Sequence, residues 1–347
     1  MRRKLFWQIP LLLFLIGGTV YIARQEHSKA YQHNSGKIFG TFYHITYQSD
    51  RNLQEEIEKE LMKVDRALSM FNDSSVISRI NRNVQEIPST EEGKMFVEVF
   101  QLGMKISEQT KGAFDMTVAP LVNAWGFGFK KGEEATQETV DSIRQFVGFE
   151  KVQLMKGRQY SVKKADPRTM LDCSAIAKGF GCDVVARLLQ RKDVSNYMIE
   201  IGGEVVAKGR NDAGNLWRIG ITKPTEDASN TNNELQGVLQ LPTTGQHLSA
   251  LATSGNYRNF YYKDGQRYAH TIDPRTGKPV QHNILSATVI APTCAMADAY
   301  ATAFMVLGLD EAKKLLESHK DLLAYLIYSD EKGNYAIWKS EQLKVEE

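Results

Sequence analysis

The stretch ATSGNYRNFYYKDGQRYAHTIDPRTGKP, residues 252–279, says most about how this chain folds and where its site lies. The small residues Ala252 to Gly255 let a ligand approach main-chain N–H groups, which suit phosphate oxygens. Residues Phe260 to His270 predict a β-hairpin, because aromatic residues flank an Asp-Gly pair, a strong two-residue turn signal. His270 ends the return strand, and Asp273 begins a sharp turn. This combination is typical of a binding site rather than of a core.

Two further motifs lie outside this stretch. Residues Asp172 to Gly179, DCSAIAKG, predict a strand end that passes into a helix. Such a junction directs N–H groups and the positive end of the helix dipole at an anion, and Lys178 would add a full charge. Asp298 and Thr302, in ADAYAT, stand four apart in a run expected to be helical, so their side chains share one face. A carboxylate and a hydroxyl there offer the hard oxygen ligands that Mg²⁺ prefers.

Structural roles explain the same residues without a ligand. Lys178 could be a solvated lysine at an ordinary helix start, since the Walker and GxGxxG spacings are absent. Thr302 could bond back to the carbonyl oxygen of Asp298. His270 could be a hydrogen-bonded structural histidine. No HExxH or other histidine pair at metal spacing occurs in the sequence, which argues against zinc. The residues by themselves leave these alternatives open.

Together the motifs resemble those of the FAD:protein FMN transferases, the ApbE family of bacterial flavin transferases. Its members carry close variants of DCSAIAKG, ATSG, H-x-I-D-P-x-T-G and ADAYAT, and the likeness runs from about Gly36 to the C-terminus. The mixed order of predicted strands and helices indicates an α+β fold. The resemblance implies an ApbE-like, T-fold-related domain of two lobes, with mixed or antiparallel sheets flanked by helices.

The resemblance also implies roles for individual residues. The metal Mg²⁺ would be held by the side chains of Asp298 and Thr302 and by the carbonyl oxygen of Ala175. We expect His270 to assist deprotonation of the acceptor threonine, because an imidazole titrates near neutral pH. Phe71 matches a position that is often tyrosine, so the stacking face is kept and the hydroxyl is lost. The residues expected to contact the FAD are Phe39, Phe71, Ala113, Phe114, Asp115, Asp172, Lys178, Thr253, Ser254, Gly255 and Ile272.

The implied reaction cleaves FAD, attaches FMN through a phosphoester bond to a threonine of an acceptor protein and releases AMP. The expected acceptors are flavoproteins of membrane redox complexes that carry a short threonine-containing target motif. Two alternatives remain: an FAD pyrophosphatase that uses water as the acceptor, and a periplasmic flavin-binding protein without turnover. The glycines of Ile201 to Glu204 are expected beside the cofactor, with no chemical role for Glu204.

The N-terminus indicates the cellular address. Arg2-Arg3-Lys4 and the apolar run Leu5 to Ala23 have the order of a secretory signal or signal anchor. At about 1.5 Å per residue this run reaches roughly 28 Å, close to the thickness of a bilayer core. We expect residues 1–35 to form a signal anchor or a cleaved signal peptide plus a polar tether, and residues 36–347 to form the transferase domain. The positive-inside rule then places the domain on the periplasmic face of the bacterial inner membrane.

Composition excludes one class of partner and says little of the cysteines. With 43 basic and 41 acidic residues, the chain has no polycationic surface for nucleic acid. The three cysteines contain no CxxC pair, so we expect each of them to be a small, buried, apolar side chain. A Cys173–Cys182 disulfide is the alternative in an oxidising compartment.

Overall fold

The computed structural model describes residues 14–18, 30–127, 135–224, 234–241, 249–256, 260–263, 266–330, 332 and 334–346. The helices are α2 (Gln54–Leu68), α3 (Val76–Asn81), α4 (Glu91–Gln109), α5 (Ala119–Ala124), α6 (Gln137–Arg144), α7 (Ala177–Arg191), α8 (Cys294–Leu307) and α9 (Leu309–Ser318). The strands are β1 (Tyr31–Ile38), β2 (Thr41–Gln48), β3 (Val152–Lys156), β4 (Tyr160–Lys164), β5 (Tyr197–Ile201), β6 (Glu204–Lys208), β7 (Trp217–Thr222), β8 (Leu235–Leu241), β9 (Ala250–Gly255), β10 (Phe260–Lys263), β11 (Gln266–Ala269), β12 (Ile272–Asp273), β13 (Lys278–Pro279), β14 (Ile284–Ala291), β15 (Leu323–Ser329), β16 (Tyr335–Lys339) and β17 (Val345–Glu346).

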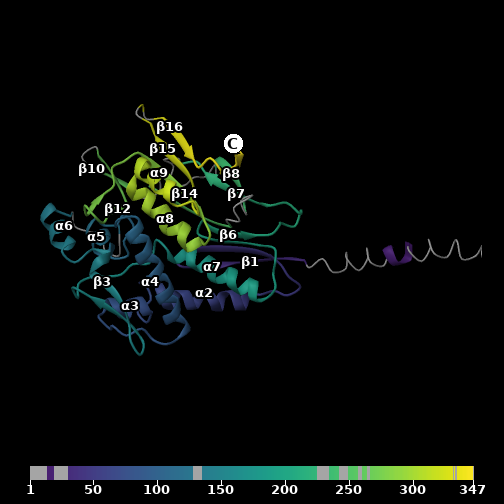
Figure 1. The fold of residues 1–347 in the computed structure, drawn as a ribbon, viewed down its shortest axis with the longest axis horizontal. Helices are drawn as coiled ribbons and strands as arrows, with labels where there is room; N and C mark the ends of the chain where they lie inside the picture. Colours follow the sequence, from purple (N-terminus) through teal and green to yellow (C-terminus); the bar gives the residue numbers. More distant parts are fainter. Residues whose placement is uncertain are drawn as a thin grey trace, which may run out of the picture.

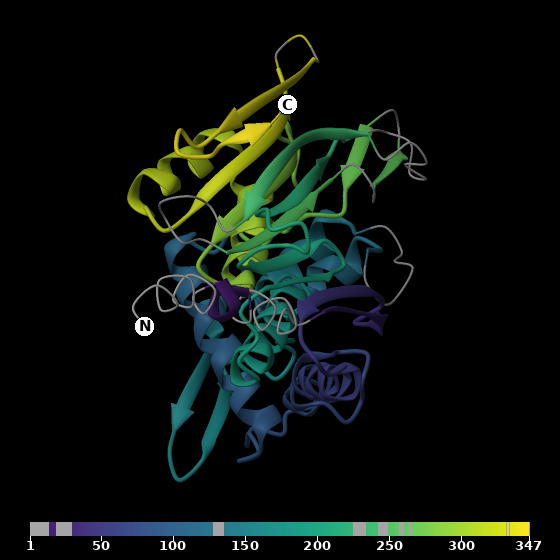
Figure 2. The ribbon, with the colours of Figure 1, turned by 90° about the vertical axis from the view of Figure 1, so that its right-hand side faces the viewer.

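An eight-stranded sheet organises the fold, in the order β1-β2-β5-β6-β9-β14-β15-β16. Every neighbouring pair in it is antiparallel. Helices α2, α7 and α8 pack on one face of the sheet, and the smaller sheet β17-β8-β7 lies against the other (Figure 1). Figure 2 shows β15 and β16 at one end of the molecule and the β3–β4 hairpin projecting at the opposite end. The structure confirms a mixed α+β fold with antiparallel sheets.

Alternation along the strands decides which residues face the helices. On β14, Ala287 and Val289 belong to the core beneath α8, whereas Ile290 packs against the small sheet. Successive side chains of a strand point to opposite faces, so a sheet covered on both sides needs apolar residues at every position. Helix α8 is buried nearly all round for the same reason, because α4, α7 and the sheet enclose it.

Helix α4 begins at a side-chain cap, and two sequence predictions are observed. The Thr90 side chain accepts a hydrogen bond from the Gly93 N–H at 3.3 Å. The predicted hairpin is present as β10 and β11, with Lys263 paired with Gln266. All three cysteines are buried free thiols, and the alternative Cys173–Cys182 disulfide is absent.

One prediction about the chain is corrected. The polar tether was expected to extend to Ser35, but β1 begins at Tyr31 and pairs along its whole length with β2. From His33 onward its exposed residues alternate with more buried ones, and the buried Asn34 is itself polar, so the sequence polarity concealed the strand. The ATSG motif, expected to let a ligand approach its main-chain N–H groups, forms part of strand β9. Most of the expected signal segment lies outside the described residues, and the described part contains no helix long and apolar enough to span a membrane.

Candidate active site

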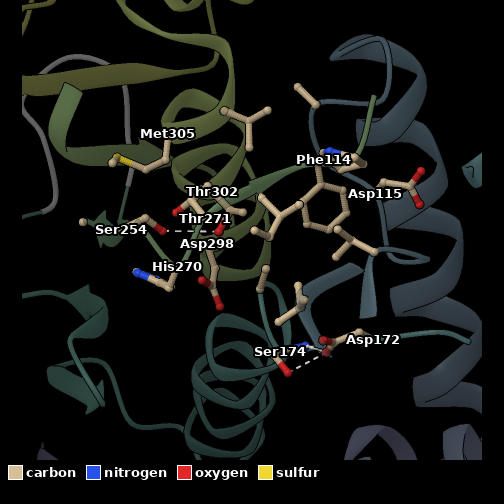
Figure 3. A pocket seen from close by; sticks show the side chains of 18 of the residues that line it. Phe114, Asp115, Asp172, Ser174, Ser254, His270, Thr271, Asp298, Thr302 and Met305 are labelled. Carbon is tan, nitrogen blue, oxygen red and sulfur yellow. Dashed lines mark hydrogen bonds between the residues drawn. The ribbon is translucent and has the colours of Figure 1, made fainter. Parts of the chain in front are cut away.

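A cavity of about 410 Å³ opens where β9, the beginning of α7 and one face of α8 meet (Figure 3). Of the predicted site residues, all except Phe39 and Phe71 line it, although they come from segments that are far apart in the sequence. The lining residues to which the sequence assigned no metal, flavin or catalytic role are Val118, Val122, Ser174, Gly202, Glu204, Thr271, Pro274, Met305 and Val306.

Phe39 and Phe71 line a second cavity of about 540 Å³, so the structure separates them from the predicted residues other than Lys178. This cavity is bounded by the end of α2 and by the Phe39-Gly40 turn between β1 and β2. Ser174 and Lys178 line both cavities, so the two adjoin. Phe71 is 81% exposed, which leaves its ring accessible for stacking against a planar ligand.

Helix α8 supplies the carboxylate and the hydroxyl, as the four-residue spacing predicts. Thr293 caps the helix by accepting a hydrogen bond from the Met296 N–H. One turn later Asp298 points into the cavity, and Thr302 follows on the same face (Figure 3). The Thr302 hydroxyl lies 3.3 Å from the Ser254 hydroxyl of β9. Three oxygen-bearing side chains from two elements therefore face one space.

Helix α7 crosses α8 closely at Gly179, and the crossing explains why the DCSAIAKG motif ends in glycine. A Cβ at this position would overlap the main-chain carbonyl of Cys294 and lie 2.8 Å from the Ala295 nitrogen. The Gly179 N–H belongs to the first turn of α7, where such groups lack a partner within the helix. It donates to Asp298 Oδ2 at 3.1 Å, so the close crossing fixes the Asp298 carboxylate.

Lys178 is the cation of the cavity. Its Nζ lies 3.1 Å from Glu204 Oε1 and 3.8 Å from Asp298 Oδ2. Burial by itself would lower the pKa of the lysine, but the attraction of Asp298 and Glu204 outweighs it and raises that pKa. Burial raises the pKa of Asp298, an effect that Lys178 opposes. The lysine is therefore a permanent positive charge between two buried carboxyl groups.

Two further predicted carboxylates bind the protein's own main chain. Asp172 Oδ1 accepts hydrogen bonds from the N–H and the hydroxyl of Ser174. Asp115 accepts from the N–H and the hydroxyl of Thr117, each at 2.7 Å, and from the Phe149 N–H at 2.8 Å. Burial raises the pKa of Asp115 to about 6. Both side chains shape the cavity wall by fixing the loops on which they lie.

His270 faces the same cavity from the segment after β11 (Figure 3). Its ring packs edge-on against Phe127, with centroids 6.5 Å apart. Asp273 does not orient the imidazole in this structure: its carboxylate receives two hydrogen bonds from the Arg275 guanidinium, and its carbonyl oxygen closes the turn with Gly277. Asp273 therefore begins the turn, as the DPRTG pattern indicates.

Comparison with known proteins identifies the family. The model of the ApbE family matches residues 39–327. An FAD:protein FMN transferase of Haemophilus influenzae is 39% identical over 86% of this chain and 87% of its own length, and that of Escherichia coli K12 is 33% identical over 89% and 87%. The flavin transferase ApbE of Vibrio cholerae superposes with a TM-score of 0.76 at 33% identity, covering 90% of this chain and 98% of that one. Pseudomonas stutzeri flavinyl transferase ApbE superposes with a TM-score of 0.77 at 28% identity, over 91% and 96%.

The matched proteins are flavin transferases, a class of enzyme. The chain belongs to the ApbE family of FAD:protein FMN transferases.

Proposed function

We propose that this protein is a Mg²⁺-dependent transferase that cleaves FAD, joins FMN to a threonine hydroxyl of an acceptor protein and releases AMP. The observation that carries the proposal is the gathering of Lys178, Asp298, Thr302 and His270 around one cavity. These residues supply a cation for a diphosphate, oxygen ligands for a hard metal and a proton acceptor for a hydroxyl.

The donor groups of the cavity fit a hard divalent cation. Asp298 is 2% exposed, so its carboxylate is poorly solvated and gains from a positive partner. Thr302 and the carbonyl of Ala175, which also lines the cavity, add neutral oxygen donors. Among the described residues no group of three or more His, Cys, Asp or Glu side chains gathers as a metal site. An oxygen-only donor set with one carboxylate suits Mg²⁺ that keeps water and phosphate ligands, and the bound ion would neutralise charge on the diphosphate.

The two adjoining cavities match the two halves of an extended dinucleotide. Lys178 lines both, so we place the diphosphate at their junction. The Phe71 ring offers an apolar face for the flavin ring system in one cavity, and Ala113 and Ile272 offer apolar contacts in the other. This arrangement puts the bond to be broken beside the residues of the first cavity.

The chain's own residues then account for the transfer. A bond forms between the threonine oxygen of the acceptor and the phosphorus of the FMN half, and the bond from that phosphorus to the oxygen of the AMP phosphate breaks. His270 accepts the proton of the threonine hydroxyl, which is a poor nucleophile while protonated. Lys178 stabilises negative charge on the phosphate oxygens, including the charge left on AMP.

We place the enzyme on the periplasmic face of the inner membrane, where it would modify flavoprotein subunits of membrane redox complexes. This part of the proposal depends on Arg2 to Lys4 and the apolar run that follows them. Fractionation of cells that express the full chain tests it. Recovery of the protein in the cytoplasmic fraction would refute the placement.

The activity itself is tested by following AMP. The full chain is incubated with FAD and Mg²⁺, with and without an acceptor domain that contains the target threonine. AMP release that requires the acceptor, with flavin fluorescence appearing on the acceptor band, supports transfer. AMP release without the acceptor identifies an FAD pyrophosphatase, and FAD binding without AMP release identifies a flavin-binding protein.

A further inference from the structure

The buried carboxyl group of Glu204 is a feature for which the sequence offered no role. Glu204 is the first residue of β6, is 3% exposed and lines the 410 Å³ cavity. One oxygen, Oε1, contacts Lys178, while Oε2 is buried without a hydrogen-bond partner among the described residues. A buried carboxyl group is unfavourable unless it is paired. Its position against Lys178 therefore calls for a functional explanation.

The turn before Glu204 is shaped to admit the lysine. Gly202 and Gly203 have φ angles of 63° and 103°, which side-chain-bearing residues rarely adopt. A Cβ at Gly202 would lie 2.8 Å from Thr41 Cγ2 and 3.4 Å from Lys178 Cδ. The Gly203 N–H donates to Glu200 Oε1 at 2.6 Å and so holds the turn. The missing side chain lets the lysine stem pass over the turn and reach Glu204.

Lys178 has two carboxyl groups within reach. Its Nζ is 3.1 Å from Glu204 Oε1 and 3.8 Å from Asp298 Oδ2. Coulomb attraction falls with distance, so the shorter contact dominates the position of the ammonium group. A lysine is a compact charge on a flexible stem, and without Glu204 its nearest partner would be Asp298. The ammonium would then pair with the carboxylate that we assign to the metal.

We propose that Glu204 is a positioning residue: it holds the Lys178 ammonium where the diphosphate of FAD binds and keeps it from pairing fully with Asp298. The inference rests on the proposed function, because it assigns the diphosphate to the junction beside Lys178. Glu204 acts through the lysine and does not itself contact the reacting atoms.

The direction in which Glu204→Gln changes the affinity for FAD separates the positioning role from a simple charge effect. Burial and the neighbouring Asp298 raise the pKa of Glu204 to about 8, and the negative charge that its carboxyl group does carry repels an anionic ligand, so its direct effect on the diphosphate is repulsive. By charge alone, Glu204→Gln would tighten FAD binding. A positioning role predicts the opposite, since the ammonium would move toward Asp298 and the diphosphate would lose its cation.

The experiment is a titration of the full chain with FAD, followed by quenching of flavin fluorescence, in a buffer with a chelator and no divalent cation. We expect Glu204→Gln to raise the Kd for FAD about tenfold, the size of effect that contacting charged groups produce. Lys178→Met should weaken binding at least as much, and adding Glu204→Gln to it should weaken binding no further. A merely structural role for Glu204 would weaken binding in both backgrounds.

Two variants serve as controls. Glu200→Gln removes a carboxylate from β5, beside the same turn, but keeps a side-chain oxygen that can accept the Gly203 N–H bond, and its Kd should stay within about twofold of that of the unaltered chain. Glu204→Asp keeps the charge on a shorter stem and should bind FAD between the unaltered chain and Glu204→Gln. If Glu204→Gln does not fold, the Kd of Glu204→Asp for FAD tests the proposal instead.

Each outcome either supports or refutes the positioning role of Glu204. Unchanged or tighter FAD binding by Glu204→Gln overturns the positioning role. Weakening of the same size in the Lys178→Met background also overturns it. If the unaltered chain binds no FAD, the proposed function fails and this inference fails with it. Binding by the unaltered chain without weakening in Glu204→Gln refutes the inference alone.

Discussion

Gly179→Ala should destabilise this protein strongly, whereas Gly181→Ala, two residues further along the same helix, should be nearly neutral. Both changes replace a helical glycine, and alanine is favoured in a helix by up to about 1 kcal/mol. The two sites differ in what the new methyl group meets. At Gly179 it would lie 2.6 Å from the main-chain carbonyl carbon of Cys294, about 1 Å inside ordinary van der Waals contact. At Gly181 the nearest atoms belong to the ring of Phe39, which can rotate away.

The expected magnitude follows from these contacts. Overpacking typically costs about 1–3 kcal/mol, and the upper end applies where the neighbour is main chain that cannot rotate away. Separating α7 from α8 also breaks the bond from the Gly179 N–H to Asp298, and bonds to charged acceptors contribute about 1.5–3 kcal/mol. After the gain in helix propensity, we expect Gly179→Ala to lose about 3 kcal/mol of unfolding free energy.

Urea unfolding followed by tryptophan fluorescence measures both variants against the unaltered chain. Mg²⁺ affinity provides a second measurement, because the Gly179 N–H orients the Asp298 carboxylate. If Gly179→Ala proves as stable as Gly181→Ala, then the close crossing does not constrain the fold and the explanation of the glycine is wrong.

Three further predictions concern the site. Asp298→Ala should abolish Mg²⁺-dependent turnover while the melting curve stays cooperative. Thr302→Val should lose less activity, because it removes a neutral ligand. A wild-type rate of Asp298→Ala at limiting Mg²⁺ would exclude Asp298 as a metal ligand. His270→Ala should lower kcat about 10²- to 10⁴-fold with little change in FAD affinity. Loss of less than about threefold in single turnover, with the acidic limb of the pH profile intact, would make His270 structural. Burial raises the pKa of Asp115 from 3.8 to about 6, so the folded state binds this proton more tightly than the unfolded state. Asp115 should therefore add stability as the pH falls from 7 to 4, by up to about 3 kcal/mol. Urea unfolding at several pH values should show that the unfolding free energy of Asp115→Asn rises less on acidification than that of the unaltered chain. Equal slopes of this free energy against pH would contradict the raised pKa of Asp115.

The sequence by itself determined the local chemistry of the site. Asp298 and Thr302 share a helix face because the helical repeat brings residues four apart together, whatever surrounds the helix. The helix start beside Lys178 and the turn at Asp273 depend on equally local rules, but the strand predicted before that helix is not formed: residues 169–173 are irregular and a turn leads into α7. These features, with their order along the chain, were sufficient to identify the family before any coordinate was known.

Only the tertiary structure decided which of these pieces meet. Glu204 and Lys178 form an ion pair because a glycine turn and a helix start, 26 positions apart in the sequence, arrive at one cavity. Phe71 lies in an adjoining cavity, and residues Tyr31 to Ser35 join the sheet although their composition is that of a tether. Burial and pairing depend on contacts between distant segments, and such contacts leave no periodic trace in the sequence. A carboxyl group acquires its role from the partner that the fold brings to it.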